Sequence, residues 1–367
     1  MRRAAAPGYP VVVKVGSSSL TGSAGLDGDA MRRVVGGISA LRRSGRPAVL
    51  VTSGAVAAGL PVLGLARRSA DIPALQVAAA VGQGRLMEAY ARLFGDQGLV
   101  AGQVLLTRDV LHNRDQYLHA KEALDRMLRL GVVPIVNEND TVVVDELRLG
   151  DNDRLAAMVA HLVGAGMLVI LTDTDGLFSV DPRLDQAAEL LTVVRHNDGV
   201  LESIADGGTG PLGSGGVATK VAAARMAAWS GIPTVIAGSR VEGVVAAAVD
   251  GEEVGTWVQP RPSSLSARRL WIAFGMVPAG GVEVDGGAAE ALIRNGRSLL
   301  SIGVTDVSGD FRSGNAVEVL DPAGTQIGKG RVSLDAAEVR ASMGRHSSEA
   351  GGVVIHRDDL VVLTVPG

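Results

Sequence analysis

The chain has 367 residues, of which 47% are hydrophobic and 20% charged, and its formal net charge at pH 7 is −4. This composition excludes intrinsic disorder, which requires low hydrophobicity and high net charge, and the length favours two domains. Because cysteine is absent, disulfide scaffolds, thiolate metal sites and cysteine nucleophiles are excluded. No secretory signal and no apolar run of about 18 residues is recognisable, so we expect a cytoplasmic protein without a membrane partner.

The first two thirds of the chain alternate between short β-branched runs and longer Ala- and Leu-rich segments. The runs are typical of buried parallel strands, and the longer segments have the spacing of amphipathic helices. The pattern therefore predicts an α/β three-layer sandwich with a mainly parallel sheet. The expected strands are 11–15, 48–52, 100–106, 132–136, 168–172 and 234–237, and the expected helices are 29–44, 74–94, 114–130, 153–164 and 218–230.

The composition changes near Trp257. Residues 257–268 contain two prolines and several small polar residues, a composition that predicts a linker. After it we expect one helix, 287–295, and short strands separated by turns, which indicate a small β-rich barrel. The expected strands are 298–304, 316–319, 326–332 and 361–365. The domain boundaries predicted in this way are 1–256 for a catalytic domain, 257–268 for the linker and 269–367 for the second domain.

Polar or glycine-rich segments follow the expected strands or open the expected helices. Because ligands of open α/β sheets bind at the carboxyl ends of the strands, these segments are expected to meet at one edge. Two of them contain lysines, Lys14 and Lys220, whose ammonium groups could neutralise a phosphoryl group during transfer. Each segment alone is also compatible with a turn or a helix cap. The segments are 14–19, 52–55, 137–141, 150–153, 173–178 and 213–220.

Taken together, these segments predict phosphoryl transfer without a classical P-loop, because 213–220 lacks the GxxxxGK[ST] spacing. The six histidines lie outside the segments and show no metal-binding spacing, so neither a protein-held metal nor a serine–histidine triad is expected. These segments offer no evident general base, and a carboxylate acceptor would explain why none is needed. It is already ionised at neutral pH, so positioning and charge stabilisation suffice.

In chain order, VVVKVGSSSL, LVTSGAVAAG, VGQGRLM, GVVPIVNENDTV, GDNDRLAA, LTDTDGLFSVDPR and GSGGVATK resemble the amino acid kinase family. The later segments WIAFGMVPAGGVEVDGGAAEAL and GVTDVSGDFRSGNAVEV resemble the PUA domain. The resemblance covers nearly the whole chain. It implies ATP-dependent phosphorylation of the γ-carboxylate of L-glutamate to L-glutamyl 5-phosphate, the first step of proline biosynthesis.

The same resemblance implies roles for individual residues. Lys14 would contact the ATP phosphates, Lys220 would stabilise the transferring group, and Asp153 would orient both lysines. The residues implied to bind glutamate are Ser53, Asp140 and Asn152. Those implied to bind the nucleotide, besides Lys14, are Thr172, Asp173, Ser214, Gly215, Gly216, Val217, Ala218, Thr219 and Lys220. Further implications are Mg²⁺ delivered with ATP, a homo-oligomer, proline as feedback inhibitor and a glutamyl phosphate reductase as partner.

Two alternatives remain open at this stage. The same fold could phosphorylate another acceptor, namely N-acetylglutamate, aspartate, carbamate or UMP. The chain could instead bind RNA through its PUA-like domain. Residues 265–367 contain ten Lys and Arg against twelve Asp and Glu. A net-negative domain lacks the basic surface expected of a dedicated RNA binder, so nucleic acid is not the expected partner.

Overall fold

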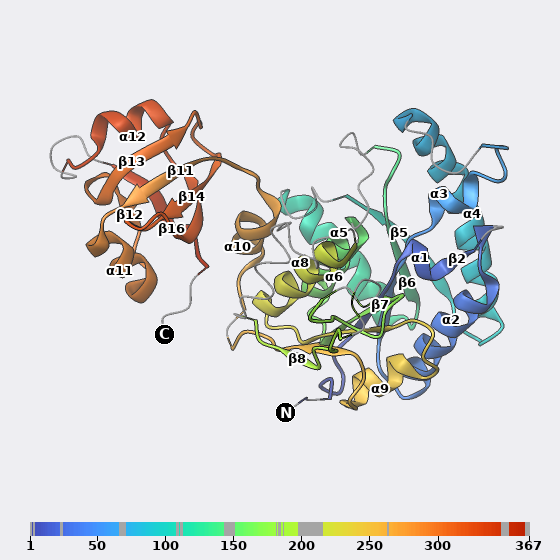
Figure 1. Ribbon diagram of the computed structural model, residues 1–367. Coiled ribbons are helices and arrows are strands. Elements are labelled where there is room, and N and C mark those ends of the chain that lie inside the picture. Colours follow the sequence, from blue (N-terminus) through green and yellow to red (C-terminus); the bar gives the residue numbers. More distant parts are fainter. Residues whose placement is uncertain are drawn as a thin grey trace. The chain divides into compact units, whose positions relative to one another are not determined.

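The computed structural model describes residues 2, 4–22, 25–65, 71–107, 110, 113–142, 151–180, 182, 185, 187–196, 216–262, 264–345 and 352–363. The chain forms two compact units, Met1–Ser264 and Leu265–Gly367 (Figure 1). Over the described residues, we find no helix with the length and apolar character that crossing a membrane requires.

The described strands of the first unit form one eight-stranded sheet in the order β5-β6-β4-β1-β7-β9-β10-β8. Among the described pairings, β9 with β10 is antiparallel and the others are parallel. The carboxyl ends of β6, β4, β1 and β7 therefore share one edge, as predicted. The bounds are β1 (Val11–Val15), β4 (Ala48–Val51), β5 (Ala101–Leu106), β6 (Val133–Glu138), β7 (Met167–Thr172), β8 (Val193–Val194), β9 (Thr234–Gly238) and β10 (Thr256–Val258).

Helices cover both faces of this sheet (Figure 1). On one face lie α2 (Gly28–Arg43), α4 (Ile72–Gly95) and α9 (Val244–Asp250), which pack on the core formed with Val11, Val13 and Val15. On the other lie α5 (Arg114–Arg129), α6 (Asp151–Leu162) and α8 (Gly216–Trp229). Because side chains alternate along a strand, Lys14 of β1 lies on the face covered by α6 and α8. The three-layer sandwich is confirmed.

Short elements complete the first unit: α1 (Ser17–Leu20), β2 (Thr21–Gly22), β3 (Gly25–Leu26) and α3 (Ala55–Gly59). The backbones of α3 and α4 are in direct contact. A Cβ atom on Gly82 would lie 1.8 Å from the carbonyl oxygen of Ala55, and one on Gly59 would lie 1.9 Å from that of Ala78. Only glycine permits this approach, which fixes α4 against α3.

In the second unit, the described strands form a six-stranded sheet in the order β12-β16-β15-β14-β11-β13. Its core is aliphatic, with Phe311 as a fully buried ring. The strands are β11 (Pro278–Val284), β12 (Leu299–Leu300), β13 (Val304–Gly309), β14 (Ala316–Leu320), β15 (Gln326–Val332) and β16 (Val353–Val362). The helices are α10 (Ala267–Leu270), η2 (Trp271–Gly275), α11 (Gly286–Asn295), η3 (Ser301–Gly303) and α12 (Ala336–Ser342).

The structure corrects several sequence predictions in detail. Trp257 and Val258, which we placed in the linker, are buried residues of β10 that pair with β8 and β9. The last predicted linker residues, Ala267 and Arg268, begin α10. The strand predicted at 298–304 is divided by η3 into β12 and β13. Strand β11 was not predicted, because its Gly280-Gly281 pair contributes no side chains to the apolar pattern.

Candidate active site

Two lysines and one aspartate from three separate elements meet at the carboxyl edge of the sheet. Lys14 Nζ of β1 lies 2.5 Å from Asp153 Oδ1 of α6, and Lys220 Nζ of α8 lies 3.7 Å from Asp153 Oδ2. The side chain of Lys14 is 4% exposed, that of Asp153 1% and that of Lys220 14%. We call these three residues the lysine centre. The convergence of Lys14 and Lys220, predicted from the sequence, is present.

The local structure explains this convergence. Asp153 and Thr219 lie in the first turns of their helices, Lys220 directly follows Thr219, and the two helices pack against each other. Thr219 Oγ1 donates a hydrogen bond to Asp153 Oδ2 at 2.7 Å, which ties α8 to α6. Lys220 Nζ also donates to the Gly216 carbonyl oxygen at 3.0 Å. The aspartate is therefore fixed from both helices.

Burial and the neighbouring charges set the electrostatics of the lysine centre. Burial lowers the pKa of Lys14, the nearby Asp153 carboxylate opposes this shift, and the Lys220 ammonium adds to it. Two ammonium groups against one carboxylate leave one net positive charge in a largely dehydrated place. A Cβ on Gly16 would lie 3.2 Å from Lys14 Nζ, so the glycine leaves the ammonium uncovered on that side. Such a centre favours an anion.

A set of neutral side chains lies on the same edge, toward β6 and β4. Asn152 Nδ2 of α6 donates to Ser53 Oγ at 3.0 Å, and Asn152 Oδ1 accepts from the Glu138 backbone N–H at 3.2 Å. The same N–H donates to Asn137 Oδ1 at 2.9 Å, and Asn137 Nδ2 donates to Gln83 Oε1 of α4 at 2.8 Å. We call Gln83, Asn137, Asn152 and Ser53 the amide network.

The predicted glutamate-binding residues are thus partly brought together. Ser53 and Asn152 are directly hydrogen-bonded, and Gly54, at a φ of 107°, turns the chain from β4 into α3 directly after Ser53. Asp140 follows β6 at the same edge by two residues. On the opposite side of β1, Thr172 ends β7 and its hydroxyl donates to Asp173 Oδ1 at 3.0 Å.

The structure describes only some of the residues that were predicted to bind the nucleotide. Gly216, Val217, Ala218 and Thr219 form the first turn of α8. Ser214 and Gly215 lie outside the described residues. The predictions missed Gln83 as a site residue, since it occupies the middle of an Ala-rich helix. They also missed Tyr90 of α4, whose hydroxyl lies 2.9 Å from Thr52 Oγ1.

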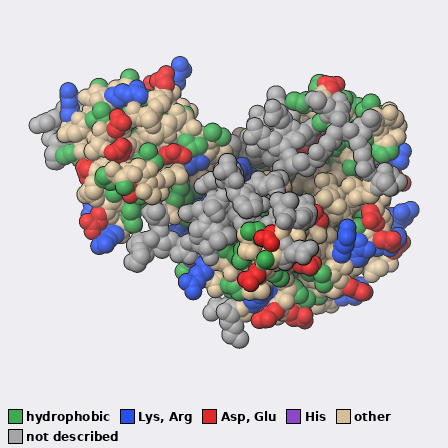
Figure 2. Space-filling view, viewed as in Figure 1, with side chains coloured by type: hydrophobic (Ala, Val, Ile, Leu, Met, Phe, Trp, Pro, Cys, Tyr) green, Lys and Arg blue, Asp and Glu red, His purple; other side chains and the backbone are tan. Residues whose placement is uncertain are grey.

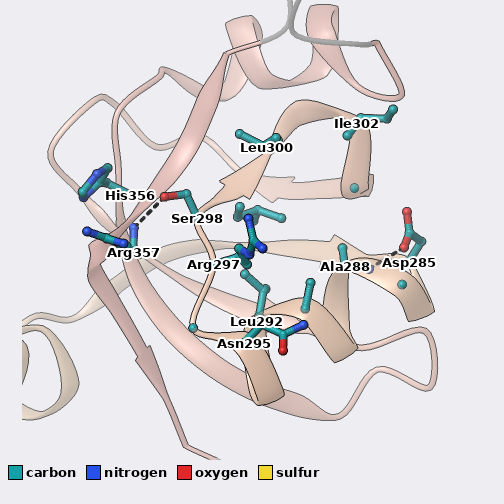
Figure 3. Close-up of a pocket in the computed structure, with 15 residues that line it drawn as sticks. Asp285, Ala288, Leu292, Asn295, Arg297, Ser298, Leu300, Ile302, His356 and Arg357 are labelled. Atoms are coloured by element: carbon teal, nitrogen blue, oxygen red, sulfur yellow. Dashed lines mark hydrogen bonds between the residues drawn. The ribbon is translucent and has the colours of Figure 1, made fainter.

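The second unit contains a pocket of about 960 Å³ beside α11, β12 and β16 (Figure 3). Arg297 and Arg357 are among its lining residues, and Ser298 Oγ accepts from the Arg357 backbone N–H at 2.9 Å. No lysine occurs among the described residues that line it. On the face that Figure 2 shows, basic and acidic side chains of this unit are interspersed. The charged side chains in its lining include Arg297, Arg357 and Asp285, and no pair of lysines on a buried carboxylate occurs among the described lining residues.

Comparison with known proteins gives the class of protein. Residues 10–238 match the amino acid kinase family, and residues 280–354 match the PUA domain. The chain belongs to the amino acid kinase family and carries a PUA domain, which confirms the resemblance on which the sequence analysis relied. It is a phosphotransferase, and membership of a kinase family implies that it uses ATP.

Three relatives of the chain share one printed name. The chain is 46% identical to "Glutamate 5-kinase" of Frankia casuarinae over 364 residues, 96% of each chain. It is 45% identical to the protein of that name from Marinomonas sp., over 99% of this chain and 100% of the relative. It is 44% identical to the one from Pelobacter propionicus, over 96% and 97% of the two chains.

Proposed function

We propose that this protein transfers the γ-phosphoryl group of ATP to the γ-carboxylate of L-glutamate, forming L-glutamyl 5-phosphate as the first step of proline biosynthesis. The observation that carries the proposal is the lysine centre, in which Lys14 and Lys220 pair with one buried carboxylate. The relatives' name supports the choice of glutamate as acceptor.

In the proposed reaction, an oxygen of the γ-carboxylate forms a bond to the γ-phosphorus. The bond from that phosphorus to the oxygen bridging to the β-phosphate breaks, and ADP leaves with the electron pair. Lys14 and Lys220 neutralise charge on the phosphoryl oxygens, and Asp153 holds the two ammonium groups apart and in place. No general base is required, because the attacking carboxylate is already ionised.

The acceptor would be held on the β6 and β4 side by Ser53, Asn152 and Asp140, and the nucleotide on the β7 side by Thr172 and Asp173. The order of strands supports this division, because β1 with Lys14 lies between β4 and β7. The acidic side chain of Asp140 suits the α-ammonium group of an amino acid. The first turn of α8, from Gly216 to Thr219, offers backbone N–H groups to the phosphates, as helix N-termini commonly do.

Mg²⁺ fits this site as an ion delivered by the nucleotide. Within the described part of the chain, no three His, Cys, Asp or Glu side chains are grouped so that they could hold a metal ion. The basic composition of the lysine centre also suits a bound anion rather than a bare cation. When bound, Mg²⁺ neutralises charge on the β- and γ-phosphates.

Several expectations from the resemblance are included in the proposal. An acyl phosphate is labile, which supports a glutamyl phosphate reductase as the partner that consumes the product. Feedback inhibition by proline and assembly into a homo-oligomer follow from the resemblance alone. The cytoplasmic location stays a prediction.

The test is ATP consumption with a panel of acceptors, followed by trapping of acyl phosphate with hydroxylamine. We expect a hydroxamate and stoichiometric ADP with L-glutamate alone. N-acetylglutamate, aspartate, carbamate and UMP serve as the alternative acceptors. A product with one of these, and none with glutamate, would replace the proposed acceptor. If no acceptor of the panel, glutamate included, leads to ATP consumption, the proposed reaction would be contradicted.

A further inference from the structure

We propose that Gln83, in the middle of α4, is a positioning residue that fixes the acceptor-binding side chains through Asn137. This inference rests on the proposed function, because it concerns how the site holds its acceptor. Gln83 does not contact Asn152 or Ser53 in any described hydrogen bond. It acts through Asn137, whose side chain is 1% exposed and whose Nδ2 donates to Gln83 Oε1 at 2.8 Å.

The hydrogen bonds of the Asn137 amide show how Gln83 fixes its orientation. The amide of Asn137 has two ends: Oδ1 accepts from the Glu138 backbone N–H, and Nδ2 donates to Gln83. The same Glu138 N–H also donates to Asn152 Oδ1 at 3.2 Å. One N–H is therefore shared between two amide oxygens, and the plane of the Asn137 amide decides how the N–H is divided. Without an acceptor at position 83, that plane is free to turn.

The consequence reaches the acceptor-binding residues directly. Asn152 uses its oxygen for the shared N–H and its nitrogen for Ser53 Oγ at 3.0 Å. A rotation of Asn137 changes the first of these bonds and so releases the orientation of Asn152 and Ser53. The lysine centre is held separately, by Asp153, Thr219 and the two lysines. Loss of Gln83 should therefore affect the acceptor and spare the nucleotide.

Helix α4 is built to keep Gln83 in a fixed place. The adjacent Gly82 is in backbone contact with α3, where a Cβ would lie 1.8 Å from the Ala55 carbonyl oxygen. Tyr90, two helical turns further along the same face, holds Thr52 by a hydrogen bond of 2.9 Å. Thr52 directly precedes Ser53. The helix thus supports both strand ends of the acceptor side, at Thr52 and at Asn137.

The other half of the Gln83 amide argues for a functional role rather than a stabilising one. Gln83 Nε2 is buried, and among the described residues it has no hydrogen-bond partner. A buried, unsatisfied donor costs folding free energy. An apolar side chain would avoid that cost, so the benefit of a glutamine here lies in the acceptor that it offers to Asn137.

The experiment compares steady-state kinetics of the wild-type protein with those of Gln83→Leu, Gln83→Glu and Gln97→Leu. For Gln83→Leu we expect the KM for glutamate to rise about tenfold, while the KM for ATP changes less than twofold. Gln83→Glu keeps an acceptor oxygen for Asn137 and should restore most of the glutamate KM. Gln97→Leu is the matched control, because Gln97 is exposed and accepts only from Arg43 Nη1 at 3.2 Å in the described structure.

The outcomes separate the possible failures. A variant that merely folds less well lowers kcat through the amount of active protein and leaves both KM values unchanged, which would overturn the inference. An equal rise in both KM values, or no rescue by Gln83→Glu, would also overturn it. If Gln83→Leu does not yield folded protein, Gln83→Met tests the same loss of acceptor with a side chain of similar shape. A wild-type protein that forms no hydroxamate from glutamate would contradict the proposed function itself, and this inference with it.

Discussion

The lysine centre and the amide network lie on the same edge of one sheet but are built from opposite kinds of groups. The lysine centre contains three ionisable side chains, all largely buried. The amide network contains amides, a hydroxyl and a backbone N–H, and its described hydrogen bonds are all between uncharged groups. The lysine centre takes Lys14 from β1, and the amide network takes Asn137 from β6 and Ser53 from the segment that follows β4. Helix α6 contributes to both, through Asp153 and Asn152.

The difference fits the proposed roles of the two regions. A phosphoryl group in transfer spreads negative charge over its oxygens, and fixed cations in a dehydrated place stabilise that charge most effectively. A carboxylate that must attack should instead be oriented without being bound so strongly that it loses reactivity. Neutral donors achieve this, because a uniform gain in substrate binding does not raise the rate. The ionised side chains therefore lie where the phosphoryl group would be transferred in the proposed reaction.

The largest effect should come from the lysine centre. Lys220→Ala removes one of two cations near the transferring group, and we expect kcat to fall about 10²- to 10³-fold, or about 3–4 kcal/mol. Lys121→Ala is the control, since Lys121 of α5 pairs with Asp125 and donates to the Leu162 carbonyl oxygen at the end of α6 opposite to Asp153. A folded Lys220→Ala protein with an unchanged kcat would remove the lysine centre from the mechanism.

The second effect tests the close packing of α3 against α4, the helix that carries Gln83 of the amide network. Gly82→Ala places a Cβ 1.8 Å from the Ala55 carbonyl oxygen, so α3 and α4 must separate. We expect a loss of about 2 kcal/mol of unfolding free energy, together with a raised KM for glutamate, because Gln83 moves with the helix. Denaturant unfolding and kinetics measure the two parts.

Gly84→Ala provides the matched control for this prediction. It lies in the same helix, and a Cβ there meets nothing within 4 Å. Alanine at such a position should raise stability by about 0.5 kcal/mol through helix propensity. Equal destabilisation by both substitutions would show that the close helix contact is not the cause.

How far the sequence alone could lead differs between the two regions. Lys14, Asp153 and Lys220 belong to short polar segments at strand ends or helix starts, so both pattern and resemblance pointed to them. The short apolar runs likewise predicted every long strand of the first sheet, although β5 is not the buried strand that was expected. Gln83 gave no signal in the residue pattern, although the resemblance included its segment VGQGRLM, and Tyr90 gave no signal of either kind. They lie in the interior of α4, where polar residues among alanines are ordinary, and their partners are more than 35 positions away in sequence.

The same limitation explains the errors in the fold. Strands β8 and β10 have only two and three residues, too few for an alternating pattern. β11 contains the Gly280-Gly281 pair, where a Cβ on Gly280 would lie 2.3 Å from the Ser308 carbonyl oxygen. A requirement for glycine that arises from a neighbouring strand is invisible in local sequence. Tertiary contact, not propensity, decides these segments.

A third effect concerns Asp140, the acidic residue at the acceptor side. Its proposed partner is the α-ammonium group of glutamate, and a hydrogen bond to a charged group contributes about 1.5 kcal/mol or more. Asp140→Ala should therefore raise the KM for glutamate about tenfold or more and leave the KM for ATP unchanged. Asp96→Ala, at the exposed end of α4, is the control. A KM change confined to ATP would reassign Asp140 to the nucleotide side.

The smallest expected effect is a pH dependence of ATP affinity. It arises from the loss of a proton by Lys14 and not from the loss of a side-chain contact. Burial lowers the pKa of Lys14 below its usual value of 10.5. Because the ammonium is the form that attracts phosphate, the affinity for ATP, measured without glutamate, should fall as pH rises through this lowered pKa, at a pH below 10.5. The amide network has no proton to lose in this range. In Lys14→Met this alkaline decrease should be absent, and affinity should be weaker throughout. An affinity that stays constant up to pH 10.5 in the wild-type protein would show that Lys14 does not act as a phosphate-binding cation.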